Sequence, residues 1–183
     1  MIVGFVDGTR KPLCRPFYLQ QSYYNGWLHN HTLLFIAICF PDGTFLLRGP
    51  VGGHNNDIHI LESSGLCADL PRLFRGYAIG GDGIFPTTAY IHPIEMFDRL
   101  ISPMLRKAYS SVRIAVEWLF NDITNHFQFL ALRRKQHVWQ TQPAMMYKVG
   151  AVLALARNCL YGNEISDHFQ CQSPTLSTVF PKG

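Results

Sequence analysis

Four acidic side chains, Asp7, Asp57, Asp82 and Glu117, stand at positions from which they could share one chemical task. The chain has only twelve Asp and Glu residues, so each can be weighed on its own. If these carboxylates converge, two unit charges ~4 Å apart repel by about 4 kcal/mol at an effective dielectric near 20, and the group requires protons or cations. Ligand sets made only of oxygen favour Mg²⁺ or Mn²⁺. Two such ions in one site support phosphodiester cleavage.

Each acid also has a purely structural explanation. Asp7-Gly8 and Asp82-Gly83 are common turn dipeptides, and Asp57 suits the first turn of a helix as a cap. Glu117 is one helical turn after Arg113, a pair worth only ~0.2–0.5 kcal/mol in its better orientation. Taken singly, the structural explanation is favoured for each acid. Taken together with the strand order below, the structural explanation becomes weaker.

The pattern of apolar residues predicts the elements that must position these acids. Strands are expected where short apolar runs end at turn signals, and helices where apolar residues recur every three or four positions. The expected strands are 2–6, 33–40, 44–48, 77–79 and 90–94. The expected helices begin at Asp57, at Ser102 with Pro103 in first position, and near Pro143, the last running to Leu160 before Gly162. Residues 10–26 and the tail from 163 are expected to be loops.

Three leading strands followed by alternating helix and strand predict a mixed α/β sheet with helices packed on it. A ribonuclease H-like sheet has this order. In an open sheet, ligands bind beyond the carboxyl ends of the strands, and Asp7 and Asp82 are expected at two such ends.

Composition limits the class of protein. With 183 residues, 48% of them hydrophobic and 15% charged, the chain is expected to be a single globular domain over 1–183. A net charge of +4 permits an anionic partner without requiring one. Five scattered cysteines without a C-x-x-C pair predict reduced thiols. The run Leu33–Phe40 is far shorter than the ~20 residues of a membrane span, and the first residues do not form a signal peptide, so an intracellular domain is expected.

Basic side chains near Glu117 are candidates for contacts with nucleic acid. Such residues bind phosphates, although a solvated helix face explains them equally well. No base-reading motif is present, so no target sequence is predicted. The candidates are Arg113, Arg133, Arg134 and Lys135, with Arg106 and Lys107 beside them.

Six segments of the chain occur in an order that resembles the DDE superfamily endonucleases, specifically the transposase-derived nucleases of the PIF/Harbinger group. The likeness runs from about Gly4 to Gly162, and SSVR-x-x-VEW is its most specific string. The segments are GFVDGTRKPLCRP, YYNGWLHNHTLLF, PDGTFLLRGPVGGHNND, GGDGIFP, SSVRIAVEWLF and ARNCLYG.

This resemblance implies a ribonuclease H-like catalytic domain that cuts DNA with Mg²⁺ or Mn²⁺ by a two-metal mechanism. It places the three catalytic acids of the family on Asp7, Asp82 and Glu117, and an additional metal-associated acid on Asp57. Asp82 and Glu117 are separated by 34 residues, which is typical of the DDE class. It also implies DNA as substrate, a nuclear location, and room for a separate DNA-binding partner protein that supplies targeting.

The chain departs from the group at several points. Asn56 stands where His is common, and Gly83-Ile84-Phe85-Pro86 replaces a more usual small residue and Tyr before Pro. The N-terminal helical DNA-binding region of the group is expected to be absent, with residues 163–183 as a tail. Two alternatives stay open: a catalytically inactive transposon remnant or domesticated DNA- or protein-binding module, and a metal-dependent phosphoesterase acting on small molecules.

Overall fold

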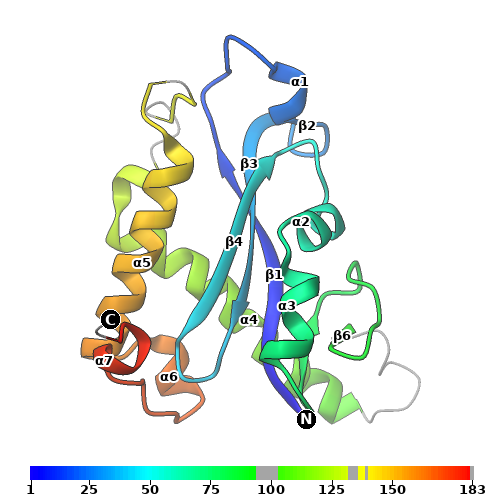
Figure 1. Ribbon diagram of the computed structural model, residues 1–183, viewed down its shortest axis with the longest axis vertical. Helices are drawn as coiled ribbons and strands as arrows, with labels where there is room; N and C mark the ends of the chain where they lie inside the picture. The colour runs from blue at the N-terminus through cyan, green and yellow to red at the C-terminus, as the bar shows by residue number, and fades with distance from the viewer. Residues whose placement is uncertain (94–102, 132–135, 139, 182–183) are drawn as a thin grey trace.

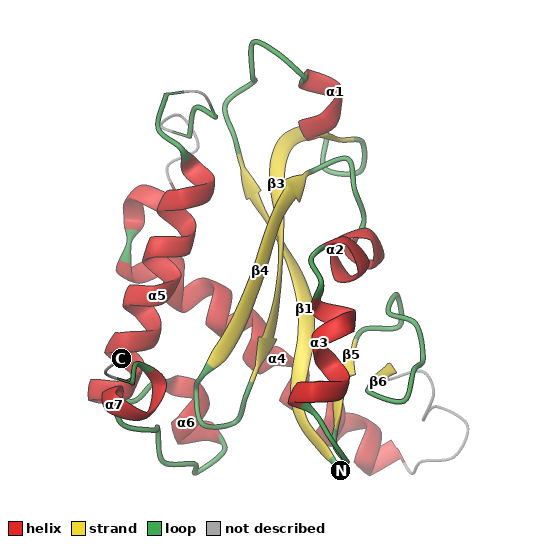
Figure 2. Cartoon of the chain, in the orientation of Figure 1, coloured by secondary structure: helices red, strands yellow, loops and turns green. Residues whose placement is uncertain are grey.

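The computed structural model describes residues 1–93, 103–131, 136–138 and 140–181, with the side chains of the long helix from residue 114 onward. A curled sheet lies between two groups of helices (Figures 1 and 2). The strands are β1 (Ile2–Pro12), β2 (Tyr24–Asn25), β3 (Asn30–Cys39), β4 (Phe45–Gly52), β5 (Ala78–Gly81) and β6 (Ile91–Pro93). The helices are α1 (Gln20–Tyr23), α2 (Asp57–Ser63), α3 (Leu66–Leu73), α4 (Pro103–His126), α5 (Pro143–Tyr161), α6 (Glu164–His168) and α7 (Leu176–Val179), with a 3₁₀ turn at Gln128–Ala131.

The sheet is mixed, as the sequence predicts. Its order is β4-β3-β1-β5-β6, and β2 pairs with the first residues of β3. β3 runs antiparallel to both β1 and β4, whereas β1, β5 and β6 are mutually parallel. The parallel pairing of β1 with β5 ends at Val6 and Gly81, so Asp7 of β1 lies beside the carboxyl end of β5, the kind of place where ligand sites form in open sheets.

Helices cover both faces of the sheet, and this explains the uninterrupted apolar run of β3. Successive side chains of a strand point to opposite faces. Phe35 and Ala37 of β3 pack in one cluster with α4 and α5, while Ile36 and Ile38 pack in a second cluster with α2 and α3. All of these side chains are inaccessible to solvent, so β3 is the centre of the core.

The helices begin and end close to the predicted residues. α4 begins at Pro103, and its buried side chains, among them Val116, Leu119 and Ile123, recur at helical spacing. α5 begins at Pro143 and is ended by Gly162, whose φ of 72° favours glycine. The helix predicted from Asp57 is divided into α2 and α3, because Gly65 has a φ of 76°.

Three predictions about the elements are wrong. Residues 10–26 are not all loop, because they include the end of β1 together with α1 and β2. β1 does not end at Val6 but continues through Asp7-Gly8 to Pro12, because β3 supplies antiparallel partners along this whole length, as far as the pair Pro12 and Thr32. The tail is not all loop, since it contains α6 and α7. α6 begins at a capping box in which Asn163 and Ser166 bond each other's backbone amides.

None of the described helices is both long and apolar enough to cross a membrane.

Candidate functional site

The parallel pairing of β1 with β5 brings Asp7 and Asp82 side by side. The last residues in register are Val6 and Gly81, and the two aspartates follow them directly. Each carboxylate accepts a hydrogen bond from the next glycine amide, at 2.8 Å from Gly8 N and 2.7 Å from Gly83 N. The two Asp-Gly pairs therefore hold their carboxylates in the same local way, one within β1 and the other just after β5.

Alternation along β1 places Asp7 on the face covered by α4. Phe5, two residues earlier, packs in the cluster formed with α4 and α5. Lys11, four residues later, has its Nζ 5.8 Å from the ring centroid of Phe120 of α4. Asp7, between them in the same alternation, is half-buried on this side of the sheet.

Asp82 belongs to the same face. Ile79 of β5 packs with α2 and α3, and a Cβ on Gly81 would lie 3.1 Å from Val6 Cγ1, on that same side. Asp82 directly follows the end of β5, where continued alternation would direct it toward α4, and it is exposed. Two carboxylates thus follow the last parallel-paired residues of neighbouring strands, which suits a hard cation because their mutual repulsion is then offset.

Glu117 comes from the helix that crosses this face. Its neighbours Val116 and Phe120 are buried against the sheet, while Glu117 itself is exposed at the margin of the buried stripe of α4. The structure thus places three of the four predicted acids on one side of the sheet. Within the residues that the structure describes, no three His, Cys, Asp or Glu side chains are grouped closely enough to hold a metal ion.

Asp57 lies on the other side. It is the first residue of α2, is 9% exposed, and is preceded by the N-cap Asn56, whose side chain accepts the amide of His59 at 2.8 Å. Its Oδ1 lies 3.1 Å from Nη2 of Arg10. A Cβ on Gly8 would lie 2.6 Å from Asp57 Cγ, so the carboxylate rests directly on the backbone of β1.

This position separates Asp57 from the other three acids. Arg10 and Gly8 share a face of β1, the face opposite to that of Asp7. Arg10 also donates to the carbonyl of Asn55 at 3.3 Å, which fixes the guanidinium against the start of α2. The structure gives Asp57 a cationic partner and does not bring it to Asp7 and Asp82.

Lys11 is a functional candidate that sequence reasoning missed. Burial lowers its pKa to about 8. Its ammonium lies 4.8 Å from the ring centroid of Tyr147. The signal in the sequence is its spacing of four from Asp7, which places both side chains on the same face of an extended β1.

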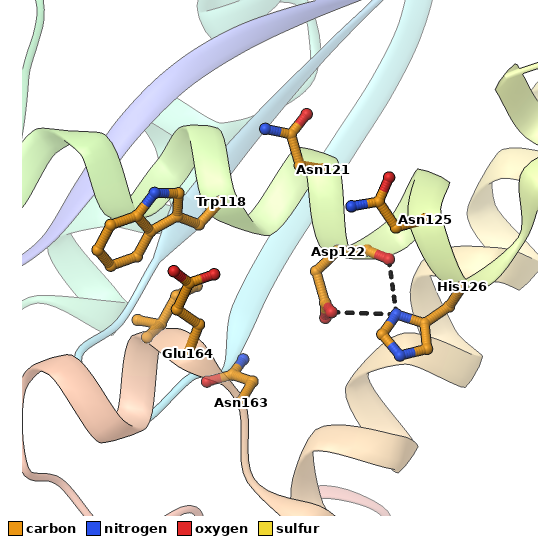
Figure 3. A pocket seen from close by; sticks show the side chains of 8 residues that line it. Trp118, Asn121, Asp122, Asn125, His126, Asn163 and Glu164 are labelled. Atoms are coloured by element: carbon orange, nitrogen blue, oxygen red, sulfur yellow. Dashed lines mark hydrogen bonds and ion pairs between the residues drawn. The ribbon is translucent and has the colours of Figure 1, made fainter.

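A polar cavity of about 240 Å³ lies against the turns of α4 that follow Glu117 (Figure 3). Asp122 is held there by Nδ1 of His126 at 3.1 Å and, in the amide orientation that satisfies both ends, by the nitrogen of Asn158 at 3.3 Å. Asn158 in turn accepts from Asn163 at 2.7 Å. The network joins α4 to α5 and α6, and none of the four predicted acids lines the cavity. Its lining is Trp118, Asn121, Asp122, Asn125, His126, Asn163, Glu164 and Ile165.

The basic candidates cannot be placed in the same way. Arg133, Arg134 and Lys135 lie outside the described residues, as does the side chain of Arg113.

Comparison with known proteins defines the class. The sequence model of the DDE superfamily endonucleases matches residues 6–156, most of the chain. The chain therefore belongs to the DDE superfamily endonuclease family, whose members are nucleases of transposase origin that act on DNA and generally use divalent metals. No curated protein and no solved structure matches the chain.

Proposed function

We propose that this protein is a divalent-metal-dependent DNA endonuclease of the PIF/Harbinger type. The observation that carries the proposal is the register that places Asp7, within β1, beside Asp82, which directly follows the end of β5, while the helix of Glu117 crosses the sheet. Acids from separate elements of one rigid sheet are what metal-assisted phosphodiester cleavage requires. DNA as substrate supports a nuclear location.

The three carboxylates proposed for the α4 face are of the ligand type that a hard divalent cation prefers, and they must move closer together to share one, since no such group is assembled among the described residues. Asp7, Asp82 and Glu117 would hold Mg²⁺ or Mn²⁺ through oxygen atoms alone. Such ions supply positive charge that activates water and stabilises the leaving oxygen. The amides of Gly8 and Gly83 orient the two aspartates through hydrogen bonds to their carboxylates. Asp57 would act from the opposite face, as the counter-ion that keeps Arg10 in place.

The strand order supports a ribonuclease H-like fold for this nuclease. Three antiparallel strands, β4, β3 and β1, are continued by the parallel β5 and β6, and a long helix crosses one face. The six sequence segments support the PIF/Harbinger type. The basic residues Arg113, Arg133, Arg134 and Lys135 are proposed to contact the DNA phosphates.

Nicking of supercoiled plasmid DNA in Mn²⁺ tests the proposal. We expect Asp82→Asn to lower the nicking rate by ~100-fold or more, since it removes a charged ligand oxygen without changing size. Asp167→Asn is the matched control, an exposed aspartate of α6 far along the chain, and should nick at the wild-type rate. Absence of nicking by the wild type, or equal nicking by Asp82→Asn, would overturn the proposal.

One observation favours the alternative of a DNA- or protein-binding module without catalysis: Asp57, one of the four acids, already has Arg10 as its partner. Calorimetric titration separates the two functions. A nuclease binds Mn²⁺ in a manner abolished by Asp82→Asn, whereas a module binds DNA with an affinity that neither Mn²⁺ nor this substitution changes.

A further inference from the structure

A loop at one end of the sheet carries large apolar side chains in full contact with solvent. We call residues 15–29, between β1 and β3, the aromatic loop; its helix α1 and strand β2 stand at one end of the molecule in Figure 1. Trp27 is 91% exposed, Phe17 78% and Tyr18 72%. These rings contribute little to the folded core, because most of their surface is exposed. Groups of exposed apolar side chains commonly mark interaction sites.

The base of the aromatic loop is firmly held, so the exposure is not a sign of a loose segment. Asn25 is buried, donates to the carbonyl of Gly53 at 2.8 Å, and accepts the amide of Leu28 at 2.9 Å. Leu19 and His29, which flank α1 and β2, have φ values of 53° and 49°, a conformation unfavourable for residues with a Cβ. A held base and two strained residues direct the rings outward, as is common at functional sites.

The charge of this region selects the partner. Residues 8–41 contain no Asp or Glu, and since Arg10 is paired with Asp57 and Lys11 is partly buried, the basic character of the loop comes from Arg15 and His29. Arg15 and His29 are exposed within the aromatic loop. Flat exposed rings beside cations and away from carboxylates are the composition of surfaces that stack nucleic-acid bases and attract phosphates.

The position of the loop relates it to the acidic site. β1 runs from Asp7 to Pro12 and enters the loop directly. These six residues span roughly 17 Å of extended chain. That length corresponds to about five nucleotide steps of 3.4 Å. A DNA strand bound at Asp7 and running along β1 would therefore come to the start of the aromatic loop after several nucleotides.

We propose that the aromatic loop binds unpaired bases of the DNA strand engaged by the acidic site, by stacking them on Trp27 and Phe17. The identity of the strand as DNA rests on the proposed function. The bases are unpaired because the faces of bases inside a duplex are already stacked on one another and are closed to a protein ring. The loop is a platform for single-stranded or extruded bases, separate in position from the carboxylates.

Fluorescence anisotropy of a labelled 15-nucleotide oligo(dT), with EDTA present so that no cleavage occurs, tests this directly. We expect Trp27→Ala and Phe17→Ala each to weaken binding about 10-fold, and Trp27→Tyr to retain most of the affinity because it keeps a stacking ring. Tyr161→Ala, which removes a ring that is 78% exposed at the end of α5, is the matched control and should bind as the wild type does. Binding to a fully paired duplex of equal length should change less than twofold in every variant.

Several outcomes would overturn the inference. Unchanged oligo(dT) affinity in Trp27→Ala, or an equal loss for single strand and duplex, would exclude base stacking. A dimer by light scattering that becomes monomeric in Trp27→Ala would assign the loop to contact between copies of the chain. Because binding is measured without metal, a loss in Trp27→Ala in a protein that never nicks DNA would support the loop while rejecting the nuclease.

Discussion

Consecutive residues of β1 serve two faces of the sheet that differ in charge balance. Toward α4, Asp7 lies next to a second carboxylate, Asp82, on the neighbouring strand. Toward α2, Gly8 and Arg10 enclose the carboxylate of Asp57 and supply it with a guanidinium at 3.1 Å. The face toward α4 therefore carries two neighbouring carboxylates, whereas the face toward α2 pairs its carboxylate with a guanidinium in a close-packed contact.

This difference between the two faces indicates different roles for aspartates that the sequence alone does not distinguish. Adjacent carboxylates repel each other, and a bound cation would offset that repulsion, so a role in binding is expected for them. A buried carboxylate with a guanidinium partner maintains structure, because removal of either one leaves an unpaired charge out of water. The α4 face is thus expected to control activity and the α2 face to control stability.

The largest expected effects separate Asp7 from Asp57. Asp7→Asn should lower Mn²⁺-dependent nicking by ~100-fold or more and change the free energy of unfolding less than a substitution of Asp57 does, since Asp7 is half-buried whereas Asp57 is buried against Arg10. Asp57→Ala should lower the free energy of unfolding by about 2–3 kcal/mol, because Arg10 loses its partner while retaining some contact with water. Urea denaturation and plasmid nicking, applied to both variants, measure the two effects.

A reversed pattern would break the comparison. If the isosteric Asp57→Asn lost nicking activity while keeping wild-type stability, Asp57 would belong with the metal ligands. The two faces would then contribute to one site.

The next effect concerns how closely the α2 face is packed. Gly8→Ala should lower the free energy of unfolding by about 1–3 kcal/mol, because its Cβ would lie 2.6 Å from Asp57 Cγ. Gly26→Ala is the control, since a Cβ there meets no atom within 4 Å, and should change stability by less than about 0.5 kcal/mol. In the double variant Gly8→Ala/Asp57→Ala, the new Cβ at position 8 no longer overlaps the carboxylate of Asp57. The loss of unfolding free energy in the double variant should therefore be smaller than the sum of the two single losses. Strict additivity would show that the contact is loose.

Local patterns in the sequence predict much of this arrangement. The apolar run of β3, the Pro143 and Gly162 boundaries of α5, and the positions of Asp7 and Asp82 beyond parallel-paired residues all follow from residue types near each position. Those signals are local, because turn residues, helix caps and periodicity act within a few positions.

The rest depends on partners distant in the chain. Asp7-Gly8 predicts a turn, yet β3 continues the ladder through both residues to Pro12. Gly8 and Arg10 share one face of the sheet only because the strand continues past Val6. The contact of Asp57 with these two residues could therefore not be inferred from a strand that ends at Val6. In the same way, α6 forms in a polar tail because Ile165 is buried in the core.

A smaller effect on the α4 face is the pH dependence of stability that Lys11 causes. Burial lowers its pKa to about 8, whereas an unfolded lysine titrates near 10.4. The folded chain therefore binds fewer protons between these values, so this residue costs stability below pH 8 and the cost disappears as pH rises toward 10. Lys11→Met should be about 1–2 kcal/mol more stable than the wild type at pH 7, an advantage that shrinks toward pH 10.

Urea denaturation at pH 7, 8, 9 and 10 measures the difference between the two proteins. The buried thiol of Cys39, whose pKa is raised to about 12 by burial and by Asp42, lowers stability above pH 9 in both proteins and cancels in that difference. An advantage of Lys11→Met that stays constant with pH would show that Lys11 titrates normally.

The smallest expected effect compares two ion pairs on the α2 and α3 side. Arg48 lies 3.2 Å from Asp69, and its hydrogen bond holds the pKa of that exposed carboxyl below its usual range. The distance nearly equals that between Arg10 and Asp57, yet solvent screens this pair. Arg48→Gln should therefore leave the urea midpoint unchanged at pH 7, whereas Arg10→Gln should lower it clearly. Equal losses would mean that proximity rather than burial sets the strength of these pairs, and Asp57 would then lose its special structural role.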